Sequence, residues 1–143
     1  IAFLDEFLHI QEYRFEDEFS YEIHVQEEAY ECKIPKMILQ PLVENACVHG
    51  LEAIEDKRLV GICVTADFTK NMLYLQVEDN GGGMTAEKLE ALKVSFQAND
   101  EKGKSVGLKN VYRRLSLYYG DRMTFDIESV VGKGTICRIC IPL

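Results

Sequence analysis

Positive charge is scarce in this sequence, which has 16 Lys and Arg residues against 24 Asp and Glu residues and a net charge of -8. This balance argues against a surface that coats nucleic acid or anionic lipid. Apolar runs such as Ile62–Val64 are far too short to cross a bilayer, and no charged segment followed by an apolar stretch opens the chain. We therefore expect a soluble domain that does not bind nucleic acid.

Proline is also rare, and the three prolines lie at or near expected element boundaries. No repeat, low-complexity tract or proline-rich linker divides the 143 residues, so one domain with one core is expected. The chain contains no GxxxxGKS or GxxxxGKT motif, which excludes a Walker-type phosphate loop.

The five cysteines are odd in number and scattered, which favours a reducing cytosol over a disulfide framework. Cys137 and Cys140 have the CxxC spacing of zinc ligands. They fall in an expected strand, however, where residues three apart point to opposite faces. We interpret the cysteines as core residues and expect no zinc site.

Hydrophobic periodicity predicts the elements of the fold. Helical spacing predicts helices over residues 1–14, from about Pro35, over Glu87–Lys93, and over Leu108–Tyr119, which Gly120 closes. Alternation predicts strands at Phe19–Val25, Val60–Phe68, Met72–Glu78, Met123–Glu128 and Thr135–Ile141. The predicted fold class is α+β: a two-layer α/β sandwich with a mixed, mostly antiparallel sheet covered on one face by helices. The polar stretch Ala86–Lys104 predicts a mobile lid.

The helix from Pro35 carries polar residues at the border of its apolar face. At about 100° per residue, Asn45 and His49 stand together there, and Glu44 precedes them. Such side chains at the rim of a core can bind a ligand lying against the helix. An ordinary polar helix end is the alternative.

Asp79 ends a strand in which Leu73, Leu75 and Val77 share its face, so its carboxylate points toward the buried side. A buried carboxylate is costly unless a donor bonds to it. The exocyclic amine of adenine is such a donor, and the glycines at 81–83 would let backbone come close to its ring. An ordinary turn after a strand is the alternative.

Flexible backbone between Gly103 and Gly107 precedes the Leu108–Tyr119 helix. The free N–H groups and dipole of a helix N-terminus favour phosphate, and Lys104 and Lys109 add positive charge. A loop that ends in an ordinary helix cap is equally compatible with this segment.

Four motifs follow one another in the chain: Glu44-Asn45 with His49-Gly50, Asp79 to Met84, Val106 to Asn110, and Gly132 to Thr135. In this order they resemble the N, G1, G2 and final glycine boxes of the GHKL (Bergerat-fold) ATPase superfamily. Residues 34–50, 107–115 and 13–15 resemble the LytS-type sensor histidine kinases. The resemblance implies an ATP-binding catalytic (HATPase) domain over 16–143, preceded over 1–15 by the end of a linker or dimerisation-side helix.

The resemblance also implies residue roles. Asn45 would ligate the Mg²⁺ that bridges the ATP phosphates, and Glu44 would act as general base or as a supporting polar group. Asp79 would bond the adenine amine, and Thr135 would help to close the adenine end. Gly81 and Gly83 would shape the adenine pocket and the hinge of the lid. Met84, which follows them, would be one of the ATP-binding residues. The phosphates would contact Val106, Gly107 and Leu108 through backbone, with Lys104, Asn110 and His49 nearby.

Two positions depart from the family pattern. Val48 stands where lysine is frequent, and Ser105 stands where the first glycine of the G2 box is expected. Loss of one cation near the phosphates costs about 1–3 kcal/mol of charge-assisted bonding. ATP affinity is then modest, or Lys104 or Lys109 substitutes.

The activity that the resemblance implies is transfer of the ATP γ-phosphoryl group to a histidine on the protein's own upstream dimerisation domain. A response regulator would be the next partner, the full-length protein would dimerise, and this chain would be the cytoplasmic part of a bacterial inner-membrane protein. None of His9, His24 and His49 resembles the acceptor histidine, so the chain alone is expected to bind ATP without phosphorylating itself. The alternatives are a nucleotide-sensing pseudokinase module and a GHKL serine kinase or ATPase.

Overall fold

The described residues form a sheet of five strands, and the candidate site residues Asp79 and Thr135 lie in two of its inner strands. The computed structural model describes residues 19–32, 38–47, 58–97 and 106–143. The strand order is β1-β2-β3-β5-β4, with β1 and β2 parallel and the other neighbours antiparallel. The bounds are β1 Phe19–Val25, β2 Arg58–Asp67, β3 Met72–Asp79, β4 Thr124–Val130 and β5 Gly134–Pro142.

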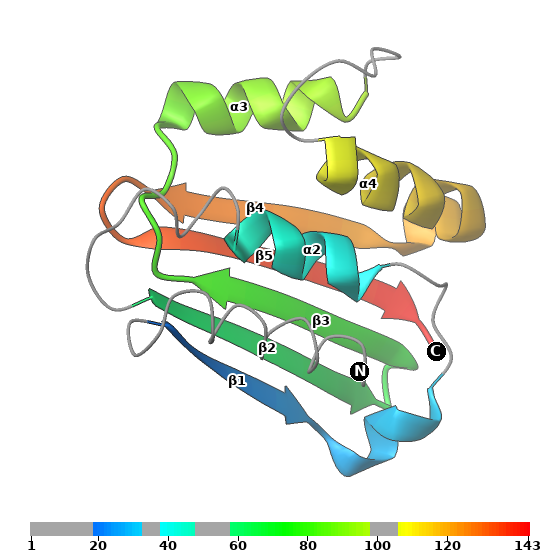
Figure 1. Ribbon diagram of the computed structural model, residues 1–143. Helices are drawn as coiled ribbons and strands as arrows, with labels where there is room; N and C mark the ends of the chain where they lie inside the picture. The colour runs from blue at the N-terminus through cyan, green and yellow to red at the C-terminus, as the bar shows by residue number, and fades with distance from the viewer. Residues whose placement is uncertain (1–18, 33–37, 48–57, 98–105) are drawn as a thin grey trace.

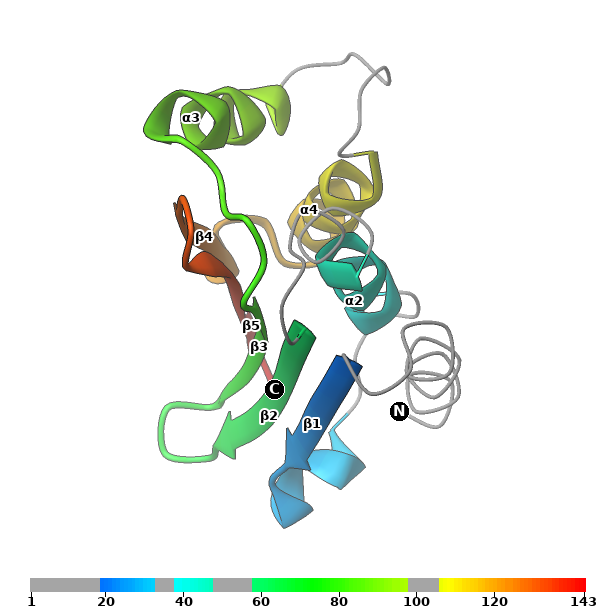
Figure 2. The same ribbon diagram turned by 60° about the vertical axis from the view of Figure 1, so that its left-hand side comes forward.

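Among the described residues, three α-helices cover one face of this sheet (Figures 1 and 2). They are α2 Leu39–Asn45, α3 Ala86–Ser95 and α4 Val106–Tyr119, and two short 3-10 helices are η2 Glu27–Glu31 and η4 Gly120–Arg122. The predicted two-layer α/β architecture with a mixed sheet is confirmed. Within the described ranges, no helix has the length and apolarity needed to cross a membrane. The helix expected at 1–14, the domain boundary at 15/16 and the start of the helix at Pro35 lie outside the described residues.

The turn of the β2–β3 hairpin is held by hydrogen bonds from its backbone to the Asp67 side chain. The Asp67 carboxylate accepts hydrogen bonds from the backbone N–H groups of Thr69 and Lys70, each at 3.0 Å. Asn71 then takes a φ of 58°, a conformation that asparagine tolerates better than most residues. The turn sets the register in which Ile62 pairs with Val77.

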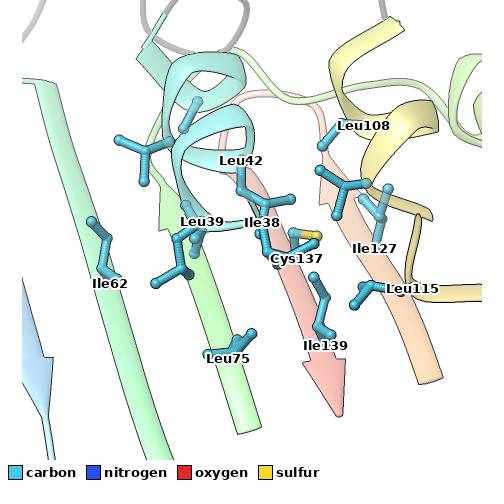
Figure 3. Packing of buried hydrophobic residues seen from close by; sticks show 14 of the residues in the cluster. Ile38, Leu39, Leu42, Ile62, Leu75, Leu108, Leu115, Ile127, Cys137 and Ile139 are labelled. Carbon is cyan, nitrogen blue, oxygen red and sulfur yellow. The ribbon is translucent and has the colours of Figure 1, made fainter. Parts of the chain in front are cut away.

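The core lies between the helices and the sheet, where alternate strand residues meet helical stripes (Figure 3). In β3 the buried residues alternate with more exposed ones, as period two requires. In α4 the buried apolar residues recur at helical spacing. The most deeply buried residues of the described part are Ile38, Val43, Cys47, Val60, Leu73, Leu75, Val111, Leu115, Ile127, Ile139 and Ile141.

Helix α3 is held to the rest of the domain by an aromatic cluster of Phe96, Tyr112 and Phe125. The Phe96 ring stacks on Tyr112 with centroids 5.2 Å apart and meets Phe125 edge-on at 5.4 Å. Gln97 Nε2 donates a hydrogen bond of 2.7 Å to the Tyr112 hydroxyl. The first ten residues of the expected lid are therefore a helix packed on α4 and β4, while 98–105 lie outside the described residues.

The α3 helix begins at a side-chain cap, which gives a direct prediction. Thr85 Oγ1 accepts a hydrogen bond of 3.2 Å from the Lys88 N–H, one of the first-turn donors that lack an intrahelical partner. Thr85→Ala is expected to lower the free energy of unfolding by about 1 kcal/mol. Urea unfolding followed by circular dichroism measures this loss. Thr85→Ser keeps the oxygen and is expected to unfold like wild type; an equal loss in both variants would contradict the capping role.

The cysteines are free thiols, but only some lie in the core. Cys47 and Cys137 are buried, as expected, whereas the other three are partly exposed: Cys32, Cys63 and Cys140. Cys32 still packs against the core, whereas the core interpretation is wrong for Cys63 and Cys140. Cys137 pairs with Val77 on the helix-covered face, and Cys140 pairs with Tyr74 on the other, so the CxxC pair cannot chelate one ion.

Candidate functional site

A row of side chains crosses four strands at one end of the helix-covered face. Asp79 pairs with Val60 of β2 on one side and with Thr135 of β5 on the other, and Thr135 pairs with Ser129 of β4. Residues directly opposite in a ladder share a face, with Cβ atoms about 4.5–5.5 Å apart. The row therefore brings one carboxylate and two hydroxyl groups together at the end where β3 and β4 stop and β5 starts (Figure 1).

Asp79 is the buried acid of this row, as the strand pattern predicts. Its side chain is 6% exposed, and Oδ1 accepts a hydrogen bond of 2.9 Å from the Gly81 N–H. The pKa of the carboxyl is raised from 3.8 to about 6, chiefly because the group is buried. Hydrogen bonds from the backbone N–H groups of Gly81 and Thr135 act in the opposite direction, and the charge of Glu78 adds a smaller increase. Above that pH the site holds a buried anion that can accept further hydrogen bonds.

Two glycines allow backbone segments to approach each other closely beside Asp79. A Cβ on Gly134 would lie 2.0 Å from the backbone oxygen of Asp79, and a Cβ on Gly83 would lie 2.1 Å from that of Val130. Both glycines have positive φ, 121° and 71° respectively. The segment after β3 thus lies directly against the β4–β5 turn, where the Gly132 N–H also donates to the Gly82 carbonyl at 2.9 Å.

Ser129 is a site residue that the sequence motifs did not reveal. Its Oγ accepts a hydrogen bond of 2.7 Å from the Met84 N–H and lies 2.8 Å from Thr135 Oγ1 and 3.2 Å from the Gly134 carbonyl oxygen. The signal was available, because strand period two places this serine on the face of Ile127. A polar residue at an apolar-face position indicates a role, as it does for Asp79.

Asn80 forms hydrogen bonds that connect the start of the glycine segment, residues 81–83, to strand β2. Its Oδ1 accepts a hydrogen bond of 2.8 Å from the Leu59 N–H, and its own N–H donates to the Leu59 carbonyl at 3.2 Å. These bonds hold the backbone that leaves β3 beside the start of β2. The sequence places Asn80 in a turn motif, and its long-range partner is visible only in the structure.

The C-terminal end of α2 reaches the same end of the sheet (Figure 1). Burial, together with the nearby charges of Asp79 and Glu44, raises the pKa of the Cys47 thiol to about 12, so the thiol stays protonated. Glu44 is exposed and accepts a hydrogen bond of 3.1 Å from Gln40 Nε2. Asn45 is half-buried at the border of the apolar face, as its helical position predicts.

The expected phosphate-binding segment is the first turn of α4. The helix begins at Val106 and includes Gly107, whose Cβ position would lie 3.8 Å from Pro41 of α2. Leu108 and Lys109 are buried and Asn110 is exposed. Four positions of the predicted site lie outside the described residues: Val48, His49, Lys104 and Ser105. In the described part of the chain, no three His, Cys, Asp or Glu side chains gather into a metal cluster.

Solved structures of histidine kinases share this fold. The histidine kinase domain of the Erythrobacter litoralis blue-light activated kinase matches with a TM-score of 0.66 at 17% identity, covering 99% of this chain and 60% of that one. Full-length ShkA, solved in complex with AMPPNP, also matches with a TM-score of 0.66 at 17% identity, covering 99% of this chain and 28% of that one. At such identities the likeness shows the fold alone.

Sequence relatives are sensor kinases. The chain is 35% identical to the sensor histidine kinase YesM of Bacillus subtilis over 95% of its length, and 31% identical to the sensor protein kinase HptS of Staphylococcus aureus over all of it. It spans only 22% and 27% of those proteins. The model of the histidine kinase-, DNA gyrase B- and HSP90-like ATPases matches residues 33–143. This chain therefore belongs to that ATPase family and is its ATP-binding domain.

Proposed function

We propose that this chain is the catalytic domain of a sensor histidine kinase, which transfers the γ-phosphoryl group of ATP to a histidine on an upstream dimerisation domain. The observation that carries the proposal is the buried Asp79 carboxylate, which lies beside the Thr135 hydroxyl where glycine backbone comes close. Membership of the ATPase family and the sensor-kinase relatives support it. The finer assignment to the LytS-type subgroup is part of the proposal.

Asp79 and its neighbours would bind the adenine ring. Neutral pH is above the Asp79 pKa of about 6, so the side chain is a buried carboxylate that accepts hydrogen bonds. The adenine amine is a matching donor for it. Thr135 offers a hydroxyl in the adjacent ladder position. Gly81, Gly83 and Met84 would form the side of the site, since the Met84 N–H and the Gly83 backbone are fixed against β4. ShkA, which shares the fold, was solved in complex with AMPPNP.

The phosphates would lie between the end of α2 and the N-terminus of α4. The first-turn N–H groups of a 14-residue helix favour an anion, so the backbone at Val106, Gly107 and Leu108 would contact them. Asn110, His49 and Lys104 would add contacts from the flanking segments, and the substitute role of Lys109 stays a prediction.

Asn45 fits the Mg²⁺ that such a reaction uses. Its half-buried amide makes no hydrogen bond to another residue of the described part, so its oxygen remains available as a ligand. When bound, the ion would neutralise charge on the phosphates, and one protein oxygen with phosphate and water ligands suits its chemistry. Glu44, exposed beside Asn45, would take a proton from the attacking group or order a water next to it.

The phosphoryl acceptor and the next partner lie beyond this chain. His24 is exposed in β1, where it pairs with Cys63 and lies on the opposite face from the buried Ile62, and His9 and His49 are outside the described residues. We therefore propose that the acceptor is on the protein's own dimerisation domain, that the full-length protein dimerises, and that a response regulator receives the group. The relatives' sensor names support a bacterial kinase whose catalytic domain works on the cytoplasmic side.

Phosphate transfer in the full-length protein tests this proposal. With γ-labelled ATP and Mg²⁺, wild type is expected to acquire an acid-labile, base-stable label, and Asn45→Ala is expected to lose at least 90% of it because the metal ligand is gone. Glu22→Gln, at an exposed position of β1, is the control and should keep the label. ATP binding without any label in wild type would favour the nucleotide-sensing module, and acid-stable label would favour a serine kinase.

A further inference from the structure

The Ser129 hydroxyl is the junction of three hydrogen bonds at the proposed adenine end. A serine oxygen can accept two hydrogen bonds and donate one. The Met84 N–H fills one acceptor position at 2.7 Å, which leaves one acceptor position and one proton for Thr135 and Gly134. The Thr135 oxygen is 2.8 Å away, an ideal distance, whereas the Gly134 carbonyl is at 3.2 Å and is a long partner for a hydroxyl.

Two proton arrangements satisfy this junction. In the first, Thr135 donates to Ser129, and Ser129 donates to the Gly134 carbonyl. In the second, Ser129 turns its proton to Thr135, and the Thr135 proton becomes free to point at a ligand. The change rotates two hydroxyl groups and gives up only the long Gly134 contact. Thr135 keeps a 2.8 Å partner in both arrangements, so donating to a ligand does not leave its oxygen without a bond.

We propose that Ser129 is a positioning residue for nucleotide recognition, which holds Thr135 so that its hydroxyl donates to the adenine ring nitrogen next to the 6-amino group. The inference rests on the proposed function, because it takes Asp79 and Thr135 as the pair that faces the base. Ser129 itself acts through Thr135 and through the Met84 backbone.

Asp79 and Thr135 together offer one hydrogen-bond acceptor and one donor, which matches the donor and acceptor of adenine. Asp79 is an acceptor and meets the amine, and Thr135 is a donor and meets a neighbouring ring nitrogen. Guanine presents the opposite pattern on its pairing edge, an oxygen beside an N–H donor, so it would place like groups together at both positions. A site with unpaired buried polar groups rejects the wrong ligand far more strongly than a shape mismatch does. Ser129 would therefore contribute to the preference for ATP over GTP.

Binding of ATP and two analogues to the whole chain separates this role from a structural one. In 1-deaza-ATP the pairing-edge ring nitrogen beside the amine is replaced by C–H, so this analogue should lose the Thr135 bond, whereas 7-deaza-ATP keeps that nitrogen and should not. Wild type is expected to bind 1-deaza-ATP roughly ten-fold more weakly than ATP, the worth of one neutral hydrogen bond. Ser129→Ala is expected to bind ATP roughly ten-fold more weakly and to bind ATP and 1-deaza-ATP equally.

Three further variants distinguish loss of the Thr135 bond from a general loss of nucleotide binding. Ser129→Thr keeps the hydroxyl and should restore the discrimination, and Ser95→Ala removes a hydroxyl that donates to the Leu92 carbonyl and should leave it unchanged. Thr135→Val should also abolish it, with no further loss when combined with Ser129→Ala. If Ser129→Ala weakens all three ligands by the same factor, the inference is wrong. If wild type binds no ATP, the proposed function itself fails.

Discussion

Replacing Gly134 with alanine is expected to remove a large part of the stability of the domain. The new Cβ would lie 2.0 Å from the backbone oxygen of Asp79, and the φ of 121° is one that residues with side chains rarely adopt. Overpacking against backbone and dihedral strain together cost roughly 3–6 kcal/mol. Since domains of this size are stable by only about 5–15 kcal/mol, urea unfolding should show a large drop in the transition midpoint.

Gly132→Ala is the matched control for this prediction. Gly132 lies in the same turn with a φ of 80°, but its Cβ would meet no atom within 4 Å. Its substitution should cost only the left-handed strain, roughly 1–2 kcal/mol. Equal losses in the two variants would mean that the close approach to Asp79 does not constrain residue 134.

Asp79→Asn is expected to stabilise the folded chain at neutral pH while removing its ligand acceptor. The pKa of Asp79 is raised from 3.8 to about 6, so the folded state binds this proton more tightly than the unfolded state. Stability from this group is therefore present below pH 4, falls as pH rises from about 4 to 6, and is lost above. Asparagine keeps an oxygen for the Gly81 N–H and carries no charge. Above pH 6 the variant should be more stable by up to about 3 kcal/mol.

Unfolding free energies of both proteins between pH 4 and pH 8 measure this effect. The difference between Asp79→Asn and wild type should be near zero at pH 4 and should reach its full value by pH 7. Other carboxyl groups titrate equally in both proteins and cancel. A constant difference across this range would contradict the raised pKa. Glu22→Gln, at an exposed position of β1, serves as the control and should show little change.

The sequence predicted the local features well because they follow from short-range periodicity. Alternation in β3 placed Asp79 on the buried face, and helical spacing in α2 placed Asn45 at a polar border. The Gly107 position was interpreted as loop backbone, yet α4 already begins at Val106. Glycine lowers helix propensity, but packing of the first turn against α2 outweighs that cost.

Features that depend on the whole sheet could not be predicted in the same way. The parallel pairing of β1 with β2 and the position of β5 between β3 and β4 are set by tertiary packing. The contacts of Ser129 with Met84 and of Asn80 with Leu59 join residues 45 and 21 positions apart. No local pattern encodes such partners, although the position of Ser129 on the apolar face of β4 was a usable signal.

Calorimetric titration of the chain with ATP tests the central claim most directly. With Mg²⁺ present, wild type is expected to bind with micromolar to sub-millimolar affinity, about -8 to -4 kcal/mol, and folded Asp79→Asn is expected to show no binding. Removing Mg²⁺ should weaken wild type but not Asn45→Ala. Binding of ATP by Asp79→Asn as tightly as by wild type, or no binding by folded wild type, would contradict the site proposed around Asp79.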